Sequence, residues 1–381
     1  MDTRGRPLDE IRARLREARA RDTPFASGRI LGSMCTAPHP VALEAWRLFE
    51  EANLGDPHLV PGARALEEAA LGSLGALLRA PPGGRGVFVT GGSEANLTAV
   101  LLALRKRGGR EVVLPESAHF SFDKACSWLG LRQVTARVKA DGTVDVDDVA
   151  ERLGPQTACV VGIAGTTELG AVDDVPALGR VCAEAGVPLH VDAAWGGFVI
   201  PFARRLGRRL PEFDLAVPGV TTLGVDPHKM GLAPIPSGVL FARDARDFEP
   251  LAVPSPYVSV ERQPTLQGTR NGAAPAATWA VMEHLGIEGY TQVVRQCLAV
   301  TDRLAKGLEA AGFPPAIPPP LSIVVFRVAD PAQARARLRE KGWLLSLAPL
   351  TGGLKVVVGP HVTAEAVDAF LEVLPSCAEA A

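Results

Sequence analysis

Residues 220–243 decide the fold class, and they read VTTLGVDPHKMGLAPIPSGVLFAR. The middle of this stretch holds four polar or kinked residues, Asp226, Pro227, His228 and Lys229. Because both ends are apolar, the pattern predicts a strand, a turn and a second strand. A lysine in such a turn has two interpretations. It is a surface residue whose stem packs on apolar neighbours, or a buried amine with a lowered pKa that attacks carbonyl groups.

The chain before this stretch repeats the strand pattern. From residue 87 onward, apolar runs alternate with helical segments, and the runs are GVFVT, EVVLP, TACVVGIAG, PLHVDAAW, LAVPGV, TTLGV and SGVLFA. Strands that are apolar throughout and separated by helices indicate a buried, mostly parallel central sheet flanked by helices. We therefore predict an α/β fold. In such sheets a ligand lies beyond the C-terminal ends of the strands, so the residues that follow each strand are the candidates for function.

Three regions are expected along the chain. Residues 1–50 form a helical N-terminal arm, residues 51–284 a large domain, and residues 285–381 a smaller C-terminal α+β domain. The last region holds a long helix and a proline-rich break, followed by SIVVFRV, PAQARARLREKGW, LKVVVG and TAEAVDAFLEVL. These four segments predict a β-α-β-α order.

The composition of the chain narrows the classes of function that it can have. The chain has 381 residues, 47% of them hydrophobic, and a formal net charge of −2. No basic tract indicates a nucleic-acid partner. No apolar run reaches the roughly 20 residues of a membrane span, and no signal-peptide core is visible, so we expect a cytoplasmic protein with no membrane partner. The six cysteines form no CxxC pair, and no metal site is expected.

Polar residues follow several of the predicted strands. TGGSEANLTAV, residues 90–100, places a glycine pair, Ser93 and Glu94 at the start of a helix, which is either an anion site or an ordinary N-cap. Asp192 ends the strand in HVDAAWGG, where it caps a turn, binds a metal with His190, or pairs with a protonated ring nitrogen.

The combination is more informative than its parts. In ESAHFSFDKA, His119 follows another strand and either stacks on a flat ring or packs in the core. A phosphate cradle, a carboxylate and a lysine in that chain order fit pyridoxal phosphate. This cofactor has a phosphate, a ring nitrogen that is best kept protonated, and an aldehyde that a lysine holds.

At this point the chain resembles a known family from about Ser27 to its end. It is similar to the fold-type I pyridoxal phosphate enzymes, in particular the archaeal L-tyrosine/L-aspartate decarboxylase group of the group II decarboxylases. The motifs that carry the resemblance are GRILGSMCT, NLGDP, GGSEAN, ESAHFSFDKA, VGIAGTTELG, LHVDAAWGGFVIPF, DPHKMGLAPIPSG and GTRNGA. Taken together they are specific, although each one alone is not.

The resemblance implies roles around a bound pyridoxal phosphate. Lys229 would form the Schiff base, His119 would stack over the ring, and Asp192 would pair with the ring nitrogen. The other implied cofactor contacts are Ala194 beneath the ring, Thr167 near it, Ser93 and His228 at the phosphate, and Gly92 and Glu94 in the phosphate loop. The resemblance also implies a homodimer with shared sites, in which Thr269 of the GTR segment reaches the partner's phosphate.

The implied reaction is α-decarboxylation of an L-amino acid. L-aspartate giving β-alanine, a coenzyme A precursor, comes first, and L-tyrosine giving tyramine, used for methanofuran, comes second. Tyr257 is the candidate acid that protonates Cα, with an ordinary loop tyrosine as the alternative. Lys355 stands where the group has an arginine that grips a substrate carboxylate, so it is either a looser substitute or a surface lysine.

Rival functions remain open at this level. A carbon–carbon lyase of the sphingosine-phosphate-lyase type would use the same cofactor site on a phosphorylated substrate. A cysteine desulfurase would need an exposed nucleophilic cysteine, for which Cys35 is the best candidate. An inactive binding scaffold is the non-enzyme alternative, and the presence of Lys229, Asp192 and His119 argues against it.

Overall fold

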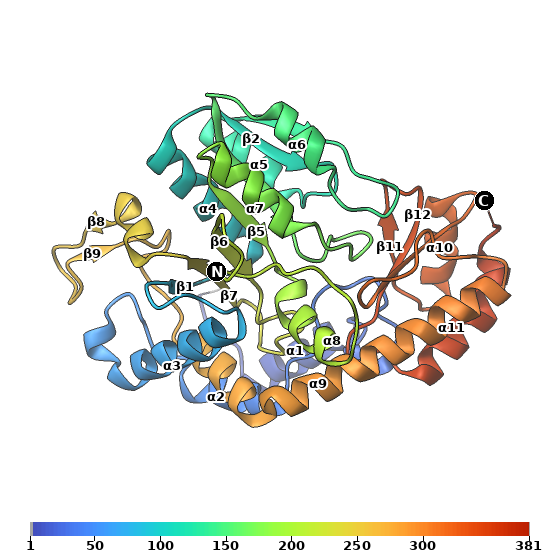
Figure 1. Ribbon diagram of the computed structural model, residues 1–381. Helices are drawn as coiled ribbons and strands as arrows, with labels where there is room; N and C mark the ends of the chain where they lie inside the picture. Colours follow the sequence, from blue (N-terminus) through green and yellow to red (C-terminus); the bar gives the residue numbers. More distant parts are fainter. Residues whose placement is uncertain (1–2, 381) are drawn as a thin grey trace.

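A seven-stranded sheet forms the centre of the computed structural model, which describes residues 3–380 (Figure 1). Residues 1–2 of the expected N-terminal arm lie outside this range. The strand order is β1-β7-β6-β5-β4-β2-β3. The strands are β1 (Arg85–Val89), β2 (Glu111–Pro115), β3 (Arg132–Ala136), β4 (Thr157–Ile163), β5 (Leu189–Asp192), β6 (Val220–Val225) and β7 (Gly238–Ala242).

The sheet is mostly parallel, as the sequence predicts. β7 runs antiparallel to both of its neighbours, β1 and β6, whereas the pairs β2–β3, β2–β4, β4–β5 and β5–β6 are parallel. The helices between the strands are α4 (Gly92–Arg107), α5 (Ser121–Leu129), α6 (Val146–Arg152), α7 (Val175–Glu184) and α8 (Ile200–Arg205). β6 and β7 form the strand–turn–strand unit predicted for residues 220–243.

Both faces of the sheet are buried. On β4, Val160 packs in the cluster that includes Leu178 of α7, whereas its neighbour Val161 packs in the cluster that includes Val100 of α4. Successive side chains of a strand point to opposite faces, so this split shows one apolar layer on each side of the sheet. The continuous Val/Ile/Leu character of the strands follows from this double burial.

The C-terminal part of the chain forms a second layer of the fold, after helix α9 (Ala273–Ala310). In Figure 1, α9 runs from beneath the large sheet toward this C-terminal layer. The layer contains an antiparallel sheet of order β10-β12-β11. Its elements are β10 (Ile323–Arg327), α10 (Pro331–Glu340), β11 (Ser346–Ala348), β12 (Gly353–Val357) and α11 (Ala364–Cys377). The fold class, an α/β fold with a C-terminal α+β layer, is therefore confirmed.

The predicted start of the long helix, near residue 285, is wrong. α9 already begins at Ala273, where Asn271 Oδ1 accepts from the Ala273 amide at 2.7 Å. Gly286 interrupts it with φ 54° and ψ −169°. The predicted domain boundary, between residues 284 and 285, falls beside Gly286 and therefore inside α9, a helix that both layers share. This boundary stays a prediction.

The N-terminal segments are helical. They are α1 (Leu8–Ala20), α2 (Pro40–Leu48) and α3 (Pro61–Leu77). The side chains of Leu8, Ile11 and Leu15 form an apolar stripe on α1 and are 61%, 38% and 65% exposed. A short hairpin of β8 (Val253–Pro254) and β9 (Arg262–Gln263) projects at the left of Figure 1. Over residues 3–380, the helices include none with the length and apolar character needed to span a membrane.

Two predictions of local structure differ from the fold. LAVPGV is not a strand, because residues 215–219 form turns in which Asp214 Oδ1 accepts from the Ala216 amide at 3.0 Å and Gly219 has φ 91°. Within the two larger sheets, β3 and β11 were not predicted, and neither were the two-residue strands β8 and β9. β3 is half exposed and polar, and β11 has three residues, so neither shows the apolar run that marks the other strands.

Candidate active site

Five segments that follow β1, β2, β4, β5 and β6 meet beyond the C-terminal ends of these strands. They enclose a cavity of about 350 Å³. Nine of the predicted site residues line it, namely Gly92, Ser93, Glu94, His119, Thr167, Asp192, Ala194, His228 and Lys229. Parallel strands place their C-terminal ends at one edge of a sheet, and this is why residues so far apart in sequence come together.

Lys229 lies in the turn after β6. Its Nζ is 3.2 Å from Asp226 Oδ2, and its carbonyl accepts from Thr36 Oγ1 at 2.8 Å. Burial disfavours the charged amine, but the carboxylates of Asp226 and Asp192 outweigh burial, so the pKa of Lys229 is raised. The expectation of a lowered pKa is therefore wrong, because Asp226 lies three residues before the lysine and turns back to pair with it.

The first turn of α4 provides the anion site. Gly91 has φ 151°, and a Cβ at this position would lie 2.9 Å from His228 Cε1. Among residues 3–380 no side chain caps this helix, so Ser93 is not an N-cap. The first amides of α4 lie at the cavity without a partner within the helix, and together with the helix dipole they favour a phosphate.

Two side chains shape this phosphate loop. Glu94 Oε2 accepts from the Thr90 amide at 2.8 Å and from Thr90 Oγ1 at 2.6 Å, which fixes the turn between β1 and α4. His228 Nδ1 donates to the Ser237 carbonyl at 2.6 Å. The other ring nitrogen, Nε2, lies 3.7 Å from Asp226 Oδ2. The imidazole is therefore held against Gly91 and the start of α4.

Asp192 ends β5 and is held by two donors. Its Oδ1 accepts from the Ala194 amide at 3.0 Å, and its Oδ2 accepts from Asn96 Nδ2 at 2.8 Å. These two hydrogen bonds fix the orientation of the carboxylate. His190 is a hydrogen-bonded core residue rather than a metal ligand, because its ring nitrogens contact Asn96 and Thr222, at 2.9 Å each.

His119 is neutral at physiological pH. Burial lowers its pKa, and the carboxylate of Asp192 opposes this shift only in part. Its Nδ1 accepts from the Ser121 amide at 3.2 Å, so the ring proton lies on Nε2. An imidazole in this tautomer offers a flat apolar face and one donor to a ligand in the cavity.

The cavity has polar atoms to offer a ligand. Within the part of the chain that the structure describes, Ser117 Oγ, Trp195 Nε1 and Asp226 Oδ1 are buried and have no hydrogen-bond partner. All three residues line the cavity. Because unpaired buried polar atoms are costly, they indicate a polar group that binds here. With the α4 amides, Asp192 and Lys229, these residues fit a phosphate, a ring nitrogen and an aldehyde, the groups that pyridoxal phosphate carries.

Comparison with known proteins gives the same result. The family model described as the pyridoxal-dependent decarboxylase conserved domain matches residues 53–329. The chain belongs to the pyridoxal-dependent decarboxylase family. It is therefore a carboxy-lyase that uses pyridoxal phosphate, and the α/β architecture described above is the fold-type I architecture of these enzymes.

Relatives match this decarboxylase over nearly its whole length. A probable L-tyrosine/L-aspartate decarboxylase of Methanothermobacter thermautotrophicus is 45% identical and covers 91% of this chain and 96% of its own. An L-aspartate decarboxylase of Thermococcus kodakarensis is 42% identical over 99% of this chain and 98% of its own. An L-aspartate/L-glutamate decarboxylase of Pyrococcus horikoshii is 42% identical and covers 97% of each chain.

Solved structures share the fold of this decarboxylase. A sphingosine-1-phosphate lyase of Burkholderia pseudomallei superposes with a TM-score of 0.91 at 27% identity, over 99% of this chain and 92% of the lyase. A glutamate decarboxylase of Lactobacillus brevis superposes with a TM-score of 0.87 at 22% identity, over 99% of this chain and 93% of that chain. The second likeness is evidence for the fold alone.

Three predicted site residues of the decarboxylase, Tyr257, Thr269 and Lys355, are not among the residues that line the cavity. Tyr257 is 89% exposed, in the hairpin between β8 and β9. Thr269 is exposed in the segment before α9. The other tyrosine, Tyr290, is buried and donates to the Gly231 carbonyl at 2.8 Å, so it serves the core. The assignments of Tyr257 and Thr269 stay predictions that depend on a partner subunit.

Lys355 lies on β12, in the C-terminal layer, and contacts Thr167, a residue that lines the cavity. Its Nζ donates to the carbonyl of Thr167 at 2.9 Å, and its side chain is buried, so the surface-lysine interpretation is wrong. The neighbouring Glu168 accepts from the amides of Thr351 at 2.7 Å and Leu350 at 3.2 Å. We call Thr167 and Glu168 the 167–168 clasp, because these two residues join the end of β4 to the C-terminal layer.

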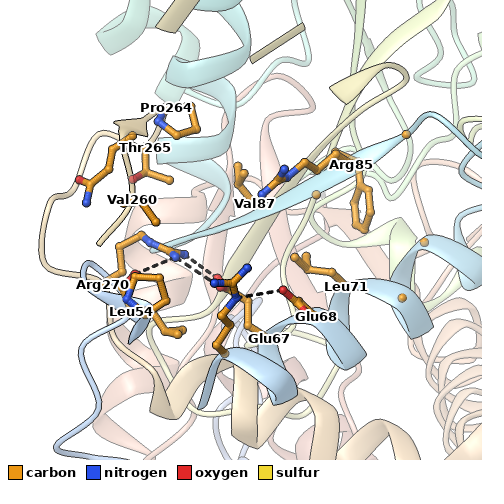
Figure 2. A pocket seen from close by; sticks show the side chains of 18 of the residues that line it. Leu54, Glu67, Glu68, Leu71, Arg85, Val87, Val260, Pro264, Thr265 and Arg270 are labelled. Atoms are coloured by element: carbon orange, nitrogen blue, oxygen red, sulfur yellow. Dashed lines mark hydrogen bonds and ion pairs between the residues drawn. The ribbon is translucent and has the colours of Figure 1, made fainter. Parts of the chain in front are cut away.

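A larger cavity lies elsewhere in the decarboxylase, between α3, β1 and the β9 segment (Figure 2). Its volume is about 600 Å³. Arg270 extends across it and donates to Glu67 Oε2 at 3.3 Å and to the Leu54 carbonyl at 3.0 Å (Figure 2). Arg270 pairs with Glu67 and Arg64 pairs with Glu68, and the cavity holds none of the predicted cofactor residues. We therefore place the chemistry in the smaller cavity.

Four residues at the active site were not predicted. Asp226 is visible in the sequence as a carboxylate three residues before Lys229, but its pairing depends on the turn. Asn96 lies four residues after Gly92, so both are on one face of α4, and this spacing is the signal that would have found it. Ser117 and Trp195 follow strands, but nothing in the sequence distinguishes them from core residues.

Proposed function

We propose that this decarboxylase removes the α-carboxylate of L-aspartate and leaves β-alanine, a precursor of coenzyme A. When bound, pyridoxal phosphate supplies an electron sink for the bond between Cα and the carboxylate. Lys229 would hold its aldehyde, and Asp192 its ring nitrogen. His119 and Ala194 would contact the two faces of the ring. The amides of α4, with Ser93 and His228, would hold the phosphate.

The chain's own groups set the protonation states for this reaction. Asp226 keeps Lys229 Nζ charged and fixed at 3.2 Å until the lysine reacts. Asp192 is held in place by hydrogen bonds from Asn96 and the Ala194 amide. His119 stays neutral with its proton on Nε2. For the protonation of Cα we propose Tyr257, acting in the cavity of the partner subunit.

The observation that carries the choice of aspartate is the buried Lys355. Across residues 3–380 its amine has no ion-pair partner, although its Nζ lies 2.9 Å from the carbonyl of the cavity residue Thr167. Burial lowers the pKa of Lys355 to about 8, while Glu168 opposes this shift. A buried cation in contact with a residue of the cavity favours a substrate whose side chain ends in a carboxylate.

The direct test supplies purified enzyme and pyridoxal phosphate with L-aspartate and L-tyrosine in separate reactions. Release of CO2 and β-alanine from aspartate is the expected result. Release from tyrosine alone would replace aspartate with the aromatic substrate, and Lys355 would then have no substrate role. Cofactor binding without CO2 from either amino acid would contradict the proposal and favour a lyase that cleaves another bond.

Lys355→Met is expected to raise the KM for aspartate by about 10- to 100-fold, since a hydrogen-bonded charge pair with the substrate is lost. Methionine keeps the length and apolar stem of the lysine, so packing on β12 changes little. Steady-state kinetics with aspartate is the measurement. Lys341→Met, in the turn after α10, is the matched control and should leave the KM unchanged.

The proposed interaction between Lys355 and the substrate predicts that the KM for aspartate depends on pH. The pKa of Lys355 is about 8, so its ammonium is present below that pH and is lost as pH rises through it. Aspartate binding should therefore weaken above about pH 8 in the wild type, and this step should be missing in Lys355→Met. A KM for aspartate that is identical in both proteins at every pH would remove Lys355 from substrate binding.

The cysteine desulfurase alternative is not favoured. Cys35 is half buried, and burial raises the pKa of its thiol, with Lys229 opposing this shift. A raised pKa lowers the fraction of thiolate, which is the nucleophilic form.

We further propose a homodimer. Its support is a set of exposed apolar side chains, in which Leu48 and Leu59 are 74% and 72% exposed in addition to the stripe on α1. An apolar stripe exposed along a helix is a feature that protein–protein interfaces commonly cover. A dimer is also the setting in which the exposed Tyr257 and Thr269 would contact a cavity. The cytoplasmic location stays a prediction from the sequence.

Light scattering coupled to gel filtration is expected to give twice the chain mass of 40.0 kDa. Replacing Leu8, Ile11 and Leu15 together by glutamate should shift the protein toward the monomer, because charges then occupy the apolar stripe. The matched control replaces the exposed Arg12, Arg16 and Arg19 of the same helix by glutamine. A wild-type monomer at micromolar concentration would contradict the dimer.

A further inference from the structure

A row of buried side chains extends from Asp192 into the core. Asn96 Nδ2 donates to Asp192 Oδ2 at 2.8 Å, and Asn96 Oδ1 lies 2.9 Å from His190 Nε2. His190 Nδ1 lies 2.9 Å from Thr222 Oγ1. The side chains of Asn96, His190 and Thr222 are at most 2% exposed, so water does not compete for these bonds. They come from α4, β5 and β6, three elements of the large domain.

The donors and acceptors in this row fit in one direction only. An ionised carboxylate accepts and cannot donate, so the amide nitrogen of Asn96 must face Asp192. The amide oxygen then faces His190, whose Nε2 must carry the ring proton. His190 Nδ1 is left as an acceptor, and the Thr222 hydroxyl donates to it. Asn96 Nδ2 uses its second proton on Ser121 Oγ at 3.0 Å.

We propose that Asn96 is a positioning residue that holds the carboxylate of Asp192 aimed at the cofactor's ring nitrogen, and that His190 and Thr222 act through Asn96 by fixing the direction of its amide. If the amide turned over, its oxygen would face the carboxylate oxygen of Asp192, and two acceptors would repel each other. The inference rests on the proposed function in one respect, because it requires a cofactor with a protonated ring nitrogen.

The ionisable groups around the row allow a clean pH test. Facing it are Asp192 and His190 on β5, Cys159 on β4, His119 before α5 and Lys229 after β6. Burial lowers the pKa of His190 to about 4 and raises that of Cys159 to about 12, so neither titrates near neutrality. His190 and Cys159 therefore keep their charge states between about pH 5.5 and 8, and burial also lowers the pKa of His119.

The test measures the dissociation constant of pyridoxal phosphate and the pH dependence of its visible absorption when bound. Asn96→Ala should weaken binding by about 10- to 100-fold, the change expected when a hydrogen bond to a charged group is lost. Thr222→Val should weaken it by about 3- to 10-fold, since it removes one neutral hydrogen bond. Thr301→Val in α9 is the matched control, because its buried hydroxyl donates to the Cys297 carbonyl at 2.7 Å far from the site.

A second variant separates positioning from packing. Asn96→Asp keeps the size of the side chain, but the new carboxyl group can donate to Asp192 only when it is protonated. Its affinity for pyridoxal phosphate, relative to that of Asn96→Ala, should therefore rise as pH falls from about 8 to 5.5. A role in packing alone would make this ratio independent of pH.

The possible results distinguish a failure of this inference from a failure of the proposed function. Wild-type affinity and absorption in Asn96→Ala would overturn the inference while the proposed function stands, provided that wild-type enzyme releases CO2. Equal effects of Thr222→Val and Thr301→Val would overturn the part assigned to His190 and Thr222. Failure of the wild-type chain to bind pyridoxal phosphate would overturn both proposals.

Discussion

Lys229→Ala is expected to abolish decarboxylation, with a loss of activity on the order of 10⁴- to 10⁶-fold, which is typical of deleting a residue of covalent catalysis. The amine of Lys229 lies in the cavity and is fixed by Asp226 at 3.2 Å. It is the group that would react with the aldehyde of the cofactor. The variant should also lose the visible absorption that wild-type protein develops when pyridoxal phosphate is added.

The measurement combines an absorption spectrum with borohydride reduction and peptide mapping. In the wild type the reduced cofactor should be attached to Lys229. Lys124→Ala, an exposed lysine on α5, is the control and should keep both the spectrum and the label. A visible band and a labelled lysine elsewhere in Lys229→Ala would show that another amine holds the cofactor, and the assignment of the active site would fail.

The second large effect is expected for Asp192→Asn, which should lower kcat by about 10²- to 10³-fold at saturating cofactor, as when one preorganised electrostatic contact is removed. The side chain keeps its size but loses the charge that would stabilise a protonated ring nitrogen. The new amide also meets Asn96 Nδ2, which donates to this position at 2.8 Å, so one of the two amides must rotate. Steady-state kinetics with aspartate measures the loss.

Asp173→Asn is the matched control for removing a buried carboxylate. Asp173 accepts from the amides of Val144 at 2.8 Å and Ile163 at 2.7 Å, and its burial raises its pKa to about 6. This variant should lower the melting temperature and keep kcat. If Asp192→Asn kept the wild-type kcat at saturating cofactor, the pairing of Asp192 with a ring nitrogen would be excluded.

The sheet, and the grouping of Ser93, His119, Asp192 and Lys229 at one cavity, could be predicted because they depend on local signals. Strands buried on both faces are apolar at every position, so β2, β4, β5 and β6 stand out in the sequence. Polar residues directly after these strands, such as Asp192 and Lys229, must lie at one edge of the sheet. Chain order and spacing then identify the chemistry without any knowledge of distances.

The other parts of the site depend on contacts between distant segments. The raised pKa of Lys229 comes from Asp226 and Asp192, and no sequence pattern gives the geometry of that cluster. The burial of Lys355 requires the C-terminal layer to pack against Thr167. Tyr257 and Thr269 also show the limit of prediction from sequence, because both side chains are exposed in a single chain. α9 also began earlier than predicted, since AAPAATWAVMEHLG has no strong break before Gly286.

The 167–168 clasp has a consequence for how such enzymes diversify. The predicted cofactor residues that line the cavity lie at the ends of strands of the large sheet or in the segments that follow them, whereas the cation proposed for the substrate's side chain comes from β12 of the C-terminal layer. Thr167 and Glu168 are the places where the two sets meet. If Lys355 has the proposed role, we expect substitutions on β12 to change which amino acid is accepted without disturbing the cofactor residues. A duplicated gene could acquire a new substrate along this strand while keeping the old chemistry.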